Sequence, residues 1–202
     1  MRTLFSPFFE SELHRQANRD GRKTMTRRAI KLPDKSWILG KRPTSWGPQD
    51  DMWPFYTMVD PVGTYPTGIR SPYGCPGTVW YMREPLRQSM NGMTIYADDN
   101  VGVSGRTGKG LALWPWKSLS LSSGFMPRWA ARTFLLVTDV RVERLQDLTA
   151  DDAMAEGGYG RGEFWTVWNS INAKRGFPWE SNPWVWVYSY RLATAEEARN
   201  AE

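Results

Sequence analysis

The stretch Gly21-Arg22-Lys23-Thr24-Met25-Thr26-Arg27-Arg28 places four cations and two hydroxyls within eight residues. It follows a predicted helix, in which Phe9, Leu13 and Ala17 recur at every fourth position and form one apolar stripe. Gly21 suits the left-handed conformation that commonly ends a helix. We therefore interpret the stretch as a helix exit, and the remaining sequence, rich in tryptophan and glycine, as the walls of a pocket around it.

Composition limits the classes of protein to consider. A chain of 202 residues with 41% hydrophobic residues and 12 tryptophans is long and apolar enough to bury a core, which argues against wholesale disorder. The net charge of +5 and the isoelectric point of about 9.4 favour an anionic partner such as nucleic acid or a nucleotide. Clustered cations bind phosphate because they release its counterions.

The single cysteine, Cys75, excludes an internal disulfide and a thiolate metal cluster, as is typical of a reducing cytoplasm. The single histidine, His14, excludes a histidine-rich zinc site, and its place within the first helix predicts a solvated side chain. No metal or cofactor is expected. An apolar run of about 18 residues and a signal peptide are both lacking, so we expect a cytoplasmic protein without membrane spans.

The order of elements predicts an α+β fold in one domain over residues 1–192, followed by a frayed polar tail at 193–202. Strands are expected over residues 2–5, 77–84, 93–97, 132–145 and 182–192. The apolar run in 132–145 passes into alternation, so this strand is expected to bend. Later helices are predicted to begin after Thr149 and near Phe164, and to end at Gly157 and Gly176.

Two long loop insertions are predicted, at about residues 31–76 and 98–125. The first contains more than half of the chain's 14 prolines, which excludes a long helix, although residues 52–59 and 64–69 could pair as a hairpin.

The closing strand alternates aromatic residues with smaller ones. One face of this strand is predicted to carry Trp184, Trp186, Tyr188 and Tyr190. The other face would carry Val185, Val187 and Ser189. Such a ladder either packs in the core or stacks nucleic-acid bases, and the pattern is compatible with both.

Lys23 and Thr26 are the strongest chemical pair in the chain. If the helix continued for one more turn, they would share a face within hydrogen-bonding reach. Burial and nearby cations favour a neutral lysine amine, which can accept the proton of a threonine nucleophile. An amide leaving group also needs an acid, for which Glu156, Glu84 and Glu163 are candidates. The alternative is a basic turn that contacts phosphate or solvent.

Gly21, Lys23, Thr26 and Arg28 fill the Gly-x-Lys-x-x-Glu/Thr-x-Arg signature at the end of the first helix of the ASCH domain family. The chain thus resembles this branch of the PUA-like small β-barrels. It is also similar to larger ASCH proteins of temperate phages, and the resemblance covers nearly every segment outside the insertions. The shared segments are Gly-Arg-Lys-Thr-x-Thr-Arg-Arg, Pro-Tyr-Gly-x-Pro-Gly, Arg83-Glu84, Met126-Pro127-Arg128-Trp129-Ala130 and Asn182-Pro183-Trp184-Val185-Trp186.

The threonine form of the signature resembles small bacterial amidohydrolases that deacetylate N4-acetylcytidine with a Lys, a Thr and a later Glu. The resemblance implies catalytic roles for Lys23, Thr26 and Glu156, and it favours Glu156 over Glu84 because a Leu-Thr pair introduces its helix. Arg28 would hold the substrate, and backbone N–H groups near Gly21 would polarise the carbonyl.

Further residues are expected to line the substrate pocket: Arg83, Glu84, Arg128 and Trp129. The implied activity is metal-independent removal of an acyl group from a modified cytosine nucleoside or nucleotide in the cytoplasm, or in the bacterial host if the chain is phage-encoded. The alternative is a PUA-like module that binds RNA or single-stranded nucleic acid without catalysis. The acyl group, the polymer state of the substrate and the oligomeric state stay open.

Overall fold

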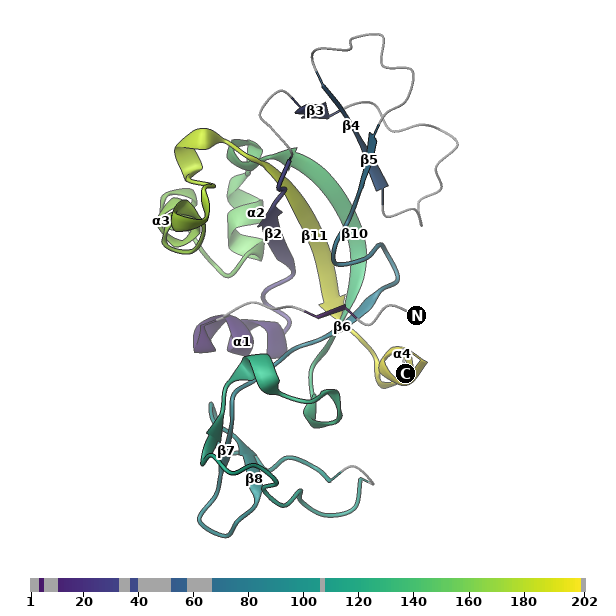
Figure 1. Cartoon of the computed structure of the whole chain (residues 1–202), viewed down its shortest axis with the longest axis vertical. Coiled ribbons are helices and arrows are strands. Elements are labelled where there is room, and N and C mark those ends of the chain that lie inside the picture. Colours follow the sequence, from purple (N-terminus) through teal and green to yellow (C-terminus); the bar gives the residue numbers. More distant parts are fainter. Residues whose placement is uncertain are drawn as a thin grey trace.

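Strands β10 (Phe134–Arg144) and β11 (Trp184–Leu192) form the centre of the fold in a computed structural model. The structure describes residues 4–5, 11–32, 37–39, 52–57, 67–105 and 108–200. The two strands belong to a five-stranded sheet with the order β1-β6-β10-β11-β2. The other strands of the sheet are β1 (Leu4–Phe5), β6 (Val79–Tyr81) and β2 (Met25–Ala29). Pairing is antiparallel except between β1 and β6, and Figure 1 shows the long strands curling like half of a barrel.

A β-bulge in β10 accounts for the predicted bend. Val137 pairs with Tyr190, whereas Val140 pairs with Tyr188, so β10 carries one residue more than β11 over this interval. Because of the extra residue, Val137 and Val140 both reach the same core cluster, although they are an odd number of positions apart. The expectation of an α+β fold with a bent central strand is confirmed.

Both faces of β11 are buried. Trp186, Tyr188 and Tyr190 are at most 3% exposed and pack with Trp80. On the other face, Val185 and its neighbours pack beneath the helices that follow β10. The predicted alternation is therefore confirmed, and these three aromatic residues are core residues, which excludes them as an open platform for bases.

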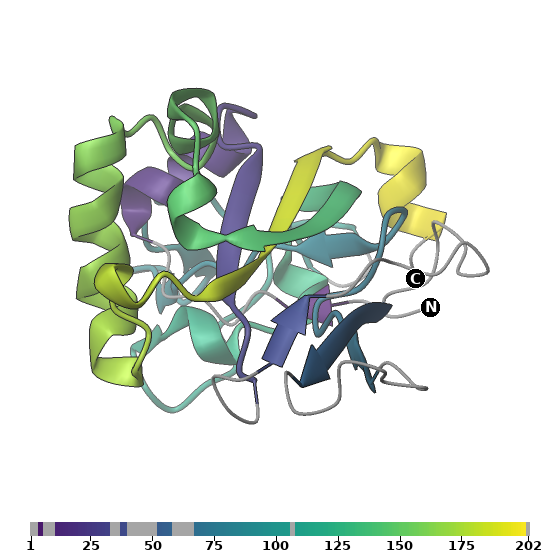
Figure 2. The ribbon, with the colours of Figure 1, turned by 90° about the horizontal axis from the view of Figure 1, so that it is seen from above.

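Helices α2 (Ala150–Ala155) and α3 (Arg161–Asn172) cover one face of the sheet, and Figure 2 shows α3 along one flank. As predicted, Thr149 caps α2, and it does so in a capping box with Asp152. Gly157 and Gly158 have φ angles of 149° and 84°, and Gly176 has a φ of 89°, so the predicted helix ends are confirmed. Short 3-10 turns η3 (Leu145–Asp147), η4 (Ala173–Arg175) and η5 (Trp179–Ser181) connect these elements.

Helix α1 (Glu12–Arg19) begins after Ser11, whose hydroxyl accepts a hydrogen bond from the His14 N–H at 3.3 Å. Ala17 is buried as predicted, but Leu13 is 80% exposed, so the predicted apolar stripe is wrong at this position. The predicted stripe also included Phe9, which lies outside the described residues.

Two small sheets lie in and beside the segments predicted as loop insertions at about 31–76 and 98–125. In the first, β4 (Met52–Thr57) pairs with β5 (Thr67–Arg70), which confirms the hairpin over the described residues, and β3 (Trp37–Leu39) pairs on the other side of β4. The second sheet has the order β8-β7-β9. Its strands are β7 (Leu86–Gln88), β8 (Thr94–Tyr96) and β9 (Ser120–Leu121), with η1 (Ser123–Phe125) and η2 (Arg128–Ala130) after them. Strand β8 confirms the strand predicted over residues 93–97. The expectation of loop was wrong for β3 and β9, and β7 was missed, because strands of two or three residues carry little periodicity.

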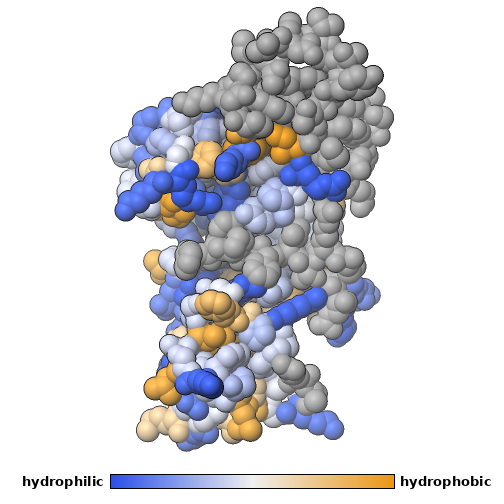
Figure 3. All heavy atoms as spheres, in the orientation of Figure 1, coloured by the Kyte–Doolittle hydropathy of each residue, from blue (hydrophilic) through white to orange (hydrophobic). Residues whose placement is uncertain are grey.

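The second of these sheets has its own buried cluster around Leu86, Tyr96 and Met126. It also leaves large apolar side chains at the surface, including Leu113, Leu119 and Phe125, each at least 70% exposed. Figure 3 shows apolar residues on this lower part of the molecule.

The C-terminal tail is helical rather than frayed. Helix α4 (Ala195–Asn200) follows Thr194, whose hydroxyl accepts the Glu197 N–H at 3.2 Å while the Glu197 carboxylate accepts the Thr194 N–H at 2.8 Å. Arg191 pairs with the same carboxylate at 2.6 Å. This reciprocal cap was visible in the sequence as Thr-x-x-Glu. Across the described ranges, the structure has no helix that is long and apolar enough to cross a membrane.

Candidate active site

The stretch Gly21–Arg28 leaves α1 and enters β2 directly. Gly21 has a φ of 71°, and the N–H groups of Arg22 and Lys23 both donate to Ala17 O, at 2.8 and 3.0 Å. These bonds end the helix, and Thr26 lies in an extended strand paired with Tyr188. The prediction that Lys23 and Thr26 share a helical face is therefore wrong. A left-handed glycine followed by β-sheet pairing overrides continuation of the helix.

A cavity of about 560 Å³ lies beside β2, between α1, the turn after α2, and α3. Its size falls within the usual range of small-molecule sites, about 300–1,000 Å³. The lining residues are His14, Lys23, Thr26, Arg27, Arg28, Tyr73, Glu156, Tyr159, Phe164, Val167, Trp168, Ile171, Asn172 and Arg175. Polar groups thus gather on the β2 side, whereas α3 contributes an apolar wall.

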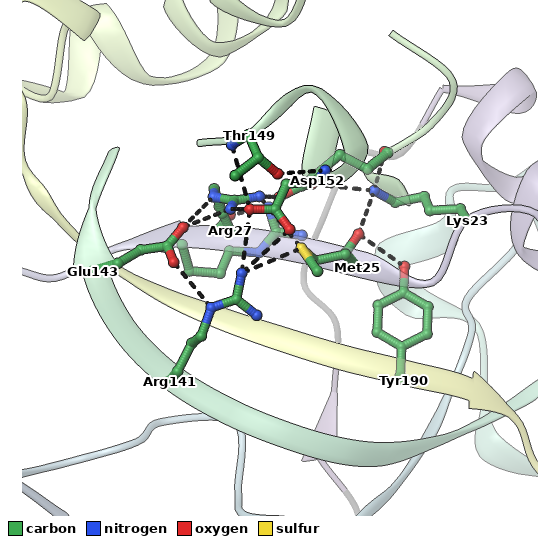
Figure 4. Close-up of polar contacts among 10 residues, drawn as sticks. Lys23, Met25, Arg27, Arg141, Glu143, Thr149, Asp152 and Tyr190 are labelled. Atoms are coloured by element: carbon green, nitrogen blue, oxygen red, sulfur yellow. Dashed lines mark hydrogen bonds and ion pairs between the residues drawn. The ribbon is translucent and has the colours of Figure 1, made fainter. Parts of the chain in front are cut away.

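Lys23, Thr26 and Glu156 line this cavity together, although each is only 4–5% exposed. Lys23 Nζ donates to Met25 O at 3.0 Å, to the main-chain oxygen of Glu156, and to Glu156 Oε2 at 3.4 Å. Figure 4 shows the amine reaching Met25, whose carbonyl also accepts from Tyr190. These three acceptors match the three hydrogens of an ammonium group. Within the described contacts, Lys23 is hydrogen-bonded to Glu156 and not to Thr26.

Arg27 lies on the other side of Glu156. Its guanidinium contacts Glu156 Oε1 at 3.2 Å, Glu143 Oε1 at 2.5 Å and Asp152 Oδ2 at 2.7 Å. Arg141 bridges Glu143 and Asp152, at 2.9 and 3.3 Å. Together with Lys23, these side chains form a six-residue group of three cations and three carboxylates, which we call the Glu156 group.

Two pKa shifts follow from this arrangement. Burial opposes the charge on Arg27, but the carboxylates of Glu156, Glu143 and Asp152 raise the pKa of Arg27 above its usual value. Burial also disfavours the charged form of Asp152, but Arg27 and Arg141 hold the pKa of Asp152 below its usual value. Arg27 and Asp152 therefore both stay charged at neutral pH.

Arg28 lines the cavity, as expected for a substrate-binding residue, and its Nη1 donates to Arg27 O at 3.3 Å. Gly21 does not belong to the lining in the described part of the chain. Its role is to end α1, and a Cβ at this position would meet Leu192 Cδ1 at 3.4 Å. The expectation that backbone groups near Gly21 contact the substrate is not supported by this placement.

The other expected pocket residues, Arg83, Glu84, Arg128 and Trp129, are also outside the described lining. Arg83 donates to Gly124 O and to the Tyr81 hydroxyl, and Trp129 stacks parallel to Trp116 with a centroid distance of 6.4 Å. Arg128 lies beside Trp129 in η2. Arg83 thus connects β6 with η1, and Trp129 packs against the buried cluster of the second small sheet.

Glu84 is fully buried in a second ion group. Arg132 binds its carboxylate with two hydrogen bonds of 2.9 and 2.6 Å, and Arg19 binds the same oxygen Oε1. Asp98 accepts two bonds of 2.7 Å from Arg15 and also pairs with Arg19 at 3.5 Å. This set, with Asp99 bound to Arg132 at 2.7 Å, is called the Glu84 group below.

Sequence reasoning missed His14 and Tyr159, which line the cavity beside Glu156. His14 is half-buried rather than solvated, and its Nε2 is hydrogen-bonded to the Tyr159 hydroxyl. The one available signal was that the chain's single histidine lies on the helix that leads into Lys23. Tyr159 had no signal, because its approach to His14 depends on how the turn after α2 folds.

No group of three or more metal-binding side chains occurs within the ranges that the structure describes. Comparison with protein-family models, curated proteins and solved structures found no match to this chain.

Proposed function

We propose that this chain is a PUA-like, ASCH-type amidohydrolase that removes an acyl group from the exocyclic amine of an N4-acylated cytosine nucleoside or nucleotide. One observation carries the proposal. Lys23 and Glu156 are 133 positions apart in the sequence, yet their charged groups meet at 3.4 Å in a cavity that Thr26 also lines. A hydroxyl nucleophile, an amine and a carboxyl group are the parts that acyl transfer without a histidine or cysteine requires.

The Lys23–Glu156 contact suggests how one pair supplies both a base and an acid. Transfer of one proton from the Lys23 ammonium to the Glu156 carboxylate yields a neutral amine and a carboxylic acid. The amine then takes the Thr26 hydroxyl proton as Thr26 attacks the acyl carbon, and the carboxylic acid protonates the leaving cytosine amine. This step leaves an acyl-threonine and restores the ammonium and the carboxylate, so protons and charges balance.

Deacylation uses the same groups. The Glu156 carboxylate takes a proton from water as the water attacks the acyl-threonine, and the departing Thr26 oxygen takes a proton from Lys23. The resulting neutral amine and carboxylic acid return to the resting ion pair by one proton transfer. Arg28 is positioned along β2 to bind the substrate or its carbonyl oxygen.

The cavity wall suits a planar, partly apolar substrate. Phe164, Val167 and Trp168 of α3 face the cavity across from the polar groups of β2. A pyrimidine ring can pack against such a wall while its substituted amine points to the catalytic groups.

The test is incubation of purified protein with N4-acetylcytidine in the presence of a chelator, with cytidine measured by chromatography. Thr26→Ala and Lys23→Ala are each expected to abolish turnover. Thr24→Ala is the matched control, because Thr24 is in the same stretch but outside the described lining. Activity near wild type in either catalytic variant, with the fold intact by circular dichroism, contradicts the mechanism.

The alternative, a nucleic-acid-binding module, retains the argument from the net charge of +5. The aromatic residues of β11 support it less than expected, because Trp186, Tyr188 and Tyr190 are buried and cannot stack bases. Salt-dependent binding of RNA or single-stranded DNA, without hydrolysis of the acylated nucleoside, is the result that would favour it over the hydrolase.

A further inference from the structure

The contact between His14 and Tyr159 joins two elements that carry the catalytic candidates. His14 lies on α1, which leads into Lys23, and Tyr159 closely follows Glu156 in the turn between α2 and α3. His14 Nε2 is hydrogen-bonded to the Tyr159 hydroxyl, and the two rings meet edge to face with centroids 5.5 Å apart at 83°. Both residues line the cavity and both are half-buried.

Gly157 allows this contact to form beside Glu156. Its φ of 149° is a conformation that other residues rarely adopt. A Cβ at this position would lie 2.9 Å from Tyr159 Cε2 and 3.0 Å from His14 Nε2. Both distances are shorter than ordinary carbon contacts, so a larger residue would push the two rings apart. The turn is therefore closed around the His14–Tyr159 contact.

Helix α1 consequently holds both partners of the Lys23–Glu156 pair. On one side, Ala17 O accepts the Lys23 N–H at 3.0 Å. On the other side, the hydrogen bond between His14 and Tyr159 attaches α1 to the turn that carries Glu156. The hydrogen bond from Thr24 N–H to Ala155 O, at 2.9 Å, ties the same two segments together at a third point.

We propose that the His14–Tyr159 pair is a clasp that fixes the Glu156 turn against α1, which makes His14 a positioning residue for the Lys23–Glu156 pair. The existence of the clasp can be tested without any activity. Its effect on catalysis rests on the proposed amidohydrolase function.

The first test uses nuclear magnetic resonance, because His14 is the only histidine in the chain and its imidazole signals need no assignment. Tyr159→Phe removes the hydroxyl and keeps the ring. We expect it to shift the ¹⁵N signal of the imidazole nitrogen that faces Tyr159. Imidazole signals identical to those of the wild type would show that the contact does not exist in solution.

The second test is hydrogen exchange at the turn. The N–H groups of Gly158 and Tyr159 donate to Met154 O at 2.7 Å and to Ala153 O at 3.3 Å. Loss of one hydrogen bond, as in His14→Leu or Tyr159→Phe, should speed exchange of these amides about fivefold or more by easier local opening. Leu13→Ala changes an exposed residue of the same helix and serves as the matched control. Unchanged exchange in both clasp variants overturns the proposal.

The third test is kinetic. With N4-acetylcytidine as substrate, His14→Leu and Tyr159→Phe should each lower kcat about fivefold to tenfold while KM changes little, because the reacting groups are misplaced and substrate contacts remain. His14→Gln should recover much of the loss, since its amide nitrogen can reach the same hydroxyl. The double variant should lose no more than the single ones, because the pair acts as a unit.

These outcomes separate the two proposals. Turnover by the wild type with an unchanged kcat in His14→Leu overturns the positioning role and leaves the proposed function standing. If the wild type releases no cytidine, the proposed function fails for this substrate, and the exchange and resonance measurements alone decide whether the clasp holds the Glu156 turn.

Discussion

Glu84 and Glu156 are both buried, and both are paired with two cations, but only Glu156 faces a cavity. The oxygens of Glu84 are engaged by Arg132 and Arg19, and its side chain is 0% exposed. Glu156 also meets Lys23 and Arg27, yet its side chain is 6% exposed and lines the 560 Å³ cavity. Burial and charge pairing are thus shared by a structural carboxylate and a candidate catalytic one.

This difference shows that a buried carboxylate can take part in a reaction only if a substrate can reach it from a cavity. A fully enclosed carboxylate that accepts bonds from arginines has no path to a substrate proton. The Glu156 carboxylate, by contrast, lines a cavity that can hold a substrate next to it. The two ion groups therefore predict opposite balances between stability and activity.

The largest expected effect is on catalysis by Glu156→Gln. Loss of the acid–base group should lower kcat by about 10²–10⁴-fold. Stability should change by only about 1 kcal/mol, because Lys23 keeps Met25 O and Arg27 keeps Glu143 and Asp152. Turnover of N4-acetylcytidine and urea unfolding measure the two quantities. A variant that hydrolyses at the wild-type rate removes Glu156 from the mechanism.

Glu84→Gln should show the reverse balance. It removes a charge that is 0% exposed and that Arg19 and Arg132 share, so that Arg19 keeps only Asp98 and Arg132 keeps only Asp99 among their ion-pair partners in the described residues. Removing one partner of a buried ion pair costs about 3–5 kcal/mol. Urea unfolding should therefore show a large loss of stability, while the folded fraction retains its kcat. Loss of turnover without loss of stability would place Glu84 with the catalytic residues after all.

The smallest expected effect is a change in acid sensitivity on Asp98→Asn. Hydrogen bonds from Arg15 hold the pKa of Asp98 below its usual value, against the opposing effect of burial. Because the folded pKa is lowered, this stabilisation is complete above the unfolded pKa of about 3.9 and is lost as the pH falls through the folded pKa. Urea midpoints measured from neutral pH downwards should fall less steeply in the variant.

A matched comparison uses Asp152→Asn, since Arg27 and Arg141 also lower the pKa of Asp152. Asp98 and Asp152 side chains are 5% and 16% exposed, so the more buried Asp98 should show the greater effect. The exposed Asp151→Asn is the control. If the urea midpoint fell with decreasing pH as steeply in both variants as in the wild type, the role given to these ion pairs would be contradicted.

The central strands and the helix ends could be predicted because each has a local cause. The alternation in β11 assigns Trp186 and Val185 to opposite faces, and the glycines after α1 and α2 adopt the backbone angles that end a helix. The two small sheets could be predicted only in part, as the hairpin of β4 and β5 and as strand β8. The missed strands β3, β7 and β9 are only two or three residues long, which is too short for a sequence pattern to reveal them.

The candidate site was predictable only where a motif supplied it. Lys23, Thr26, Arg28 and Glu156 do line one cavity, but the expected helical geometry of Lys23 and Thr26 was wrong. The hydrogen bonds of Arg83 and the burial of Glu84 follow from tertiary packing, which adjacent residues in a sequence do not reveal. His14 and Tyr159 meet across 145 positions, so no local pattern could pair them.

The bulge in β10 determines where the strand can lose a residue without disturbing the site. Beyond the bulge, Arg141 is paired with Val187 and Glu143 with Val185, so both lie on the face of the sheet where Arg27 needs them. Loss of the single codon for Thr138 would leave Val137 and Val140 two positions apart, so ordinary alternation would keep both in the aromatic core and keep Arg141 and Glu143 on the opposite face. Loss of a codon after the bulge is different: without Val142, Glu143 would stand opposite Trp186 and turn towards the aromatic core. During evolution, reading-frame-preserving deletions should therefore be tolerated at the bulge and rejected in the part of the strand that follows it.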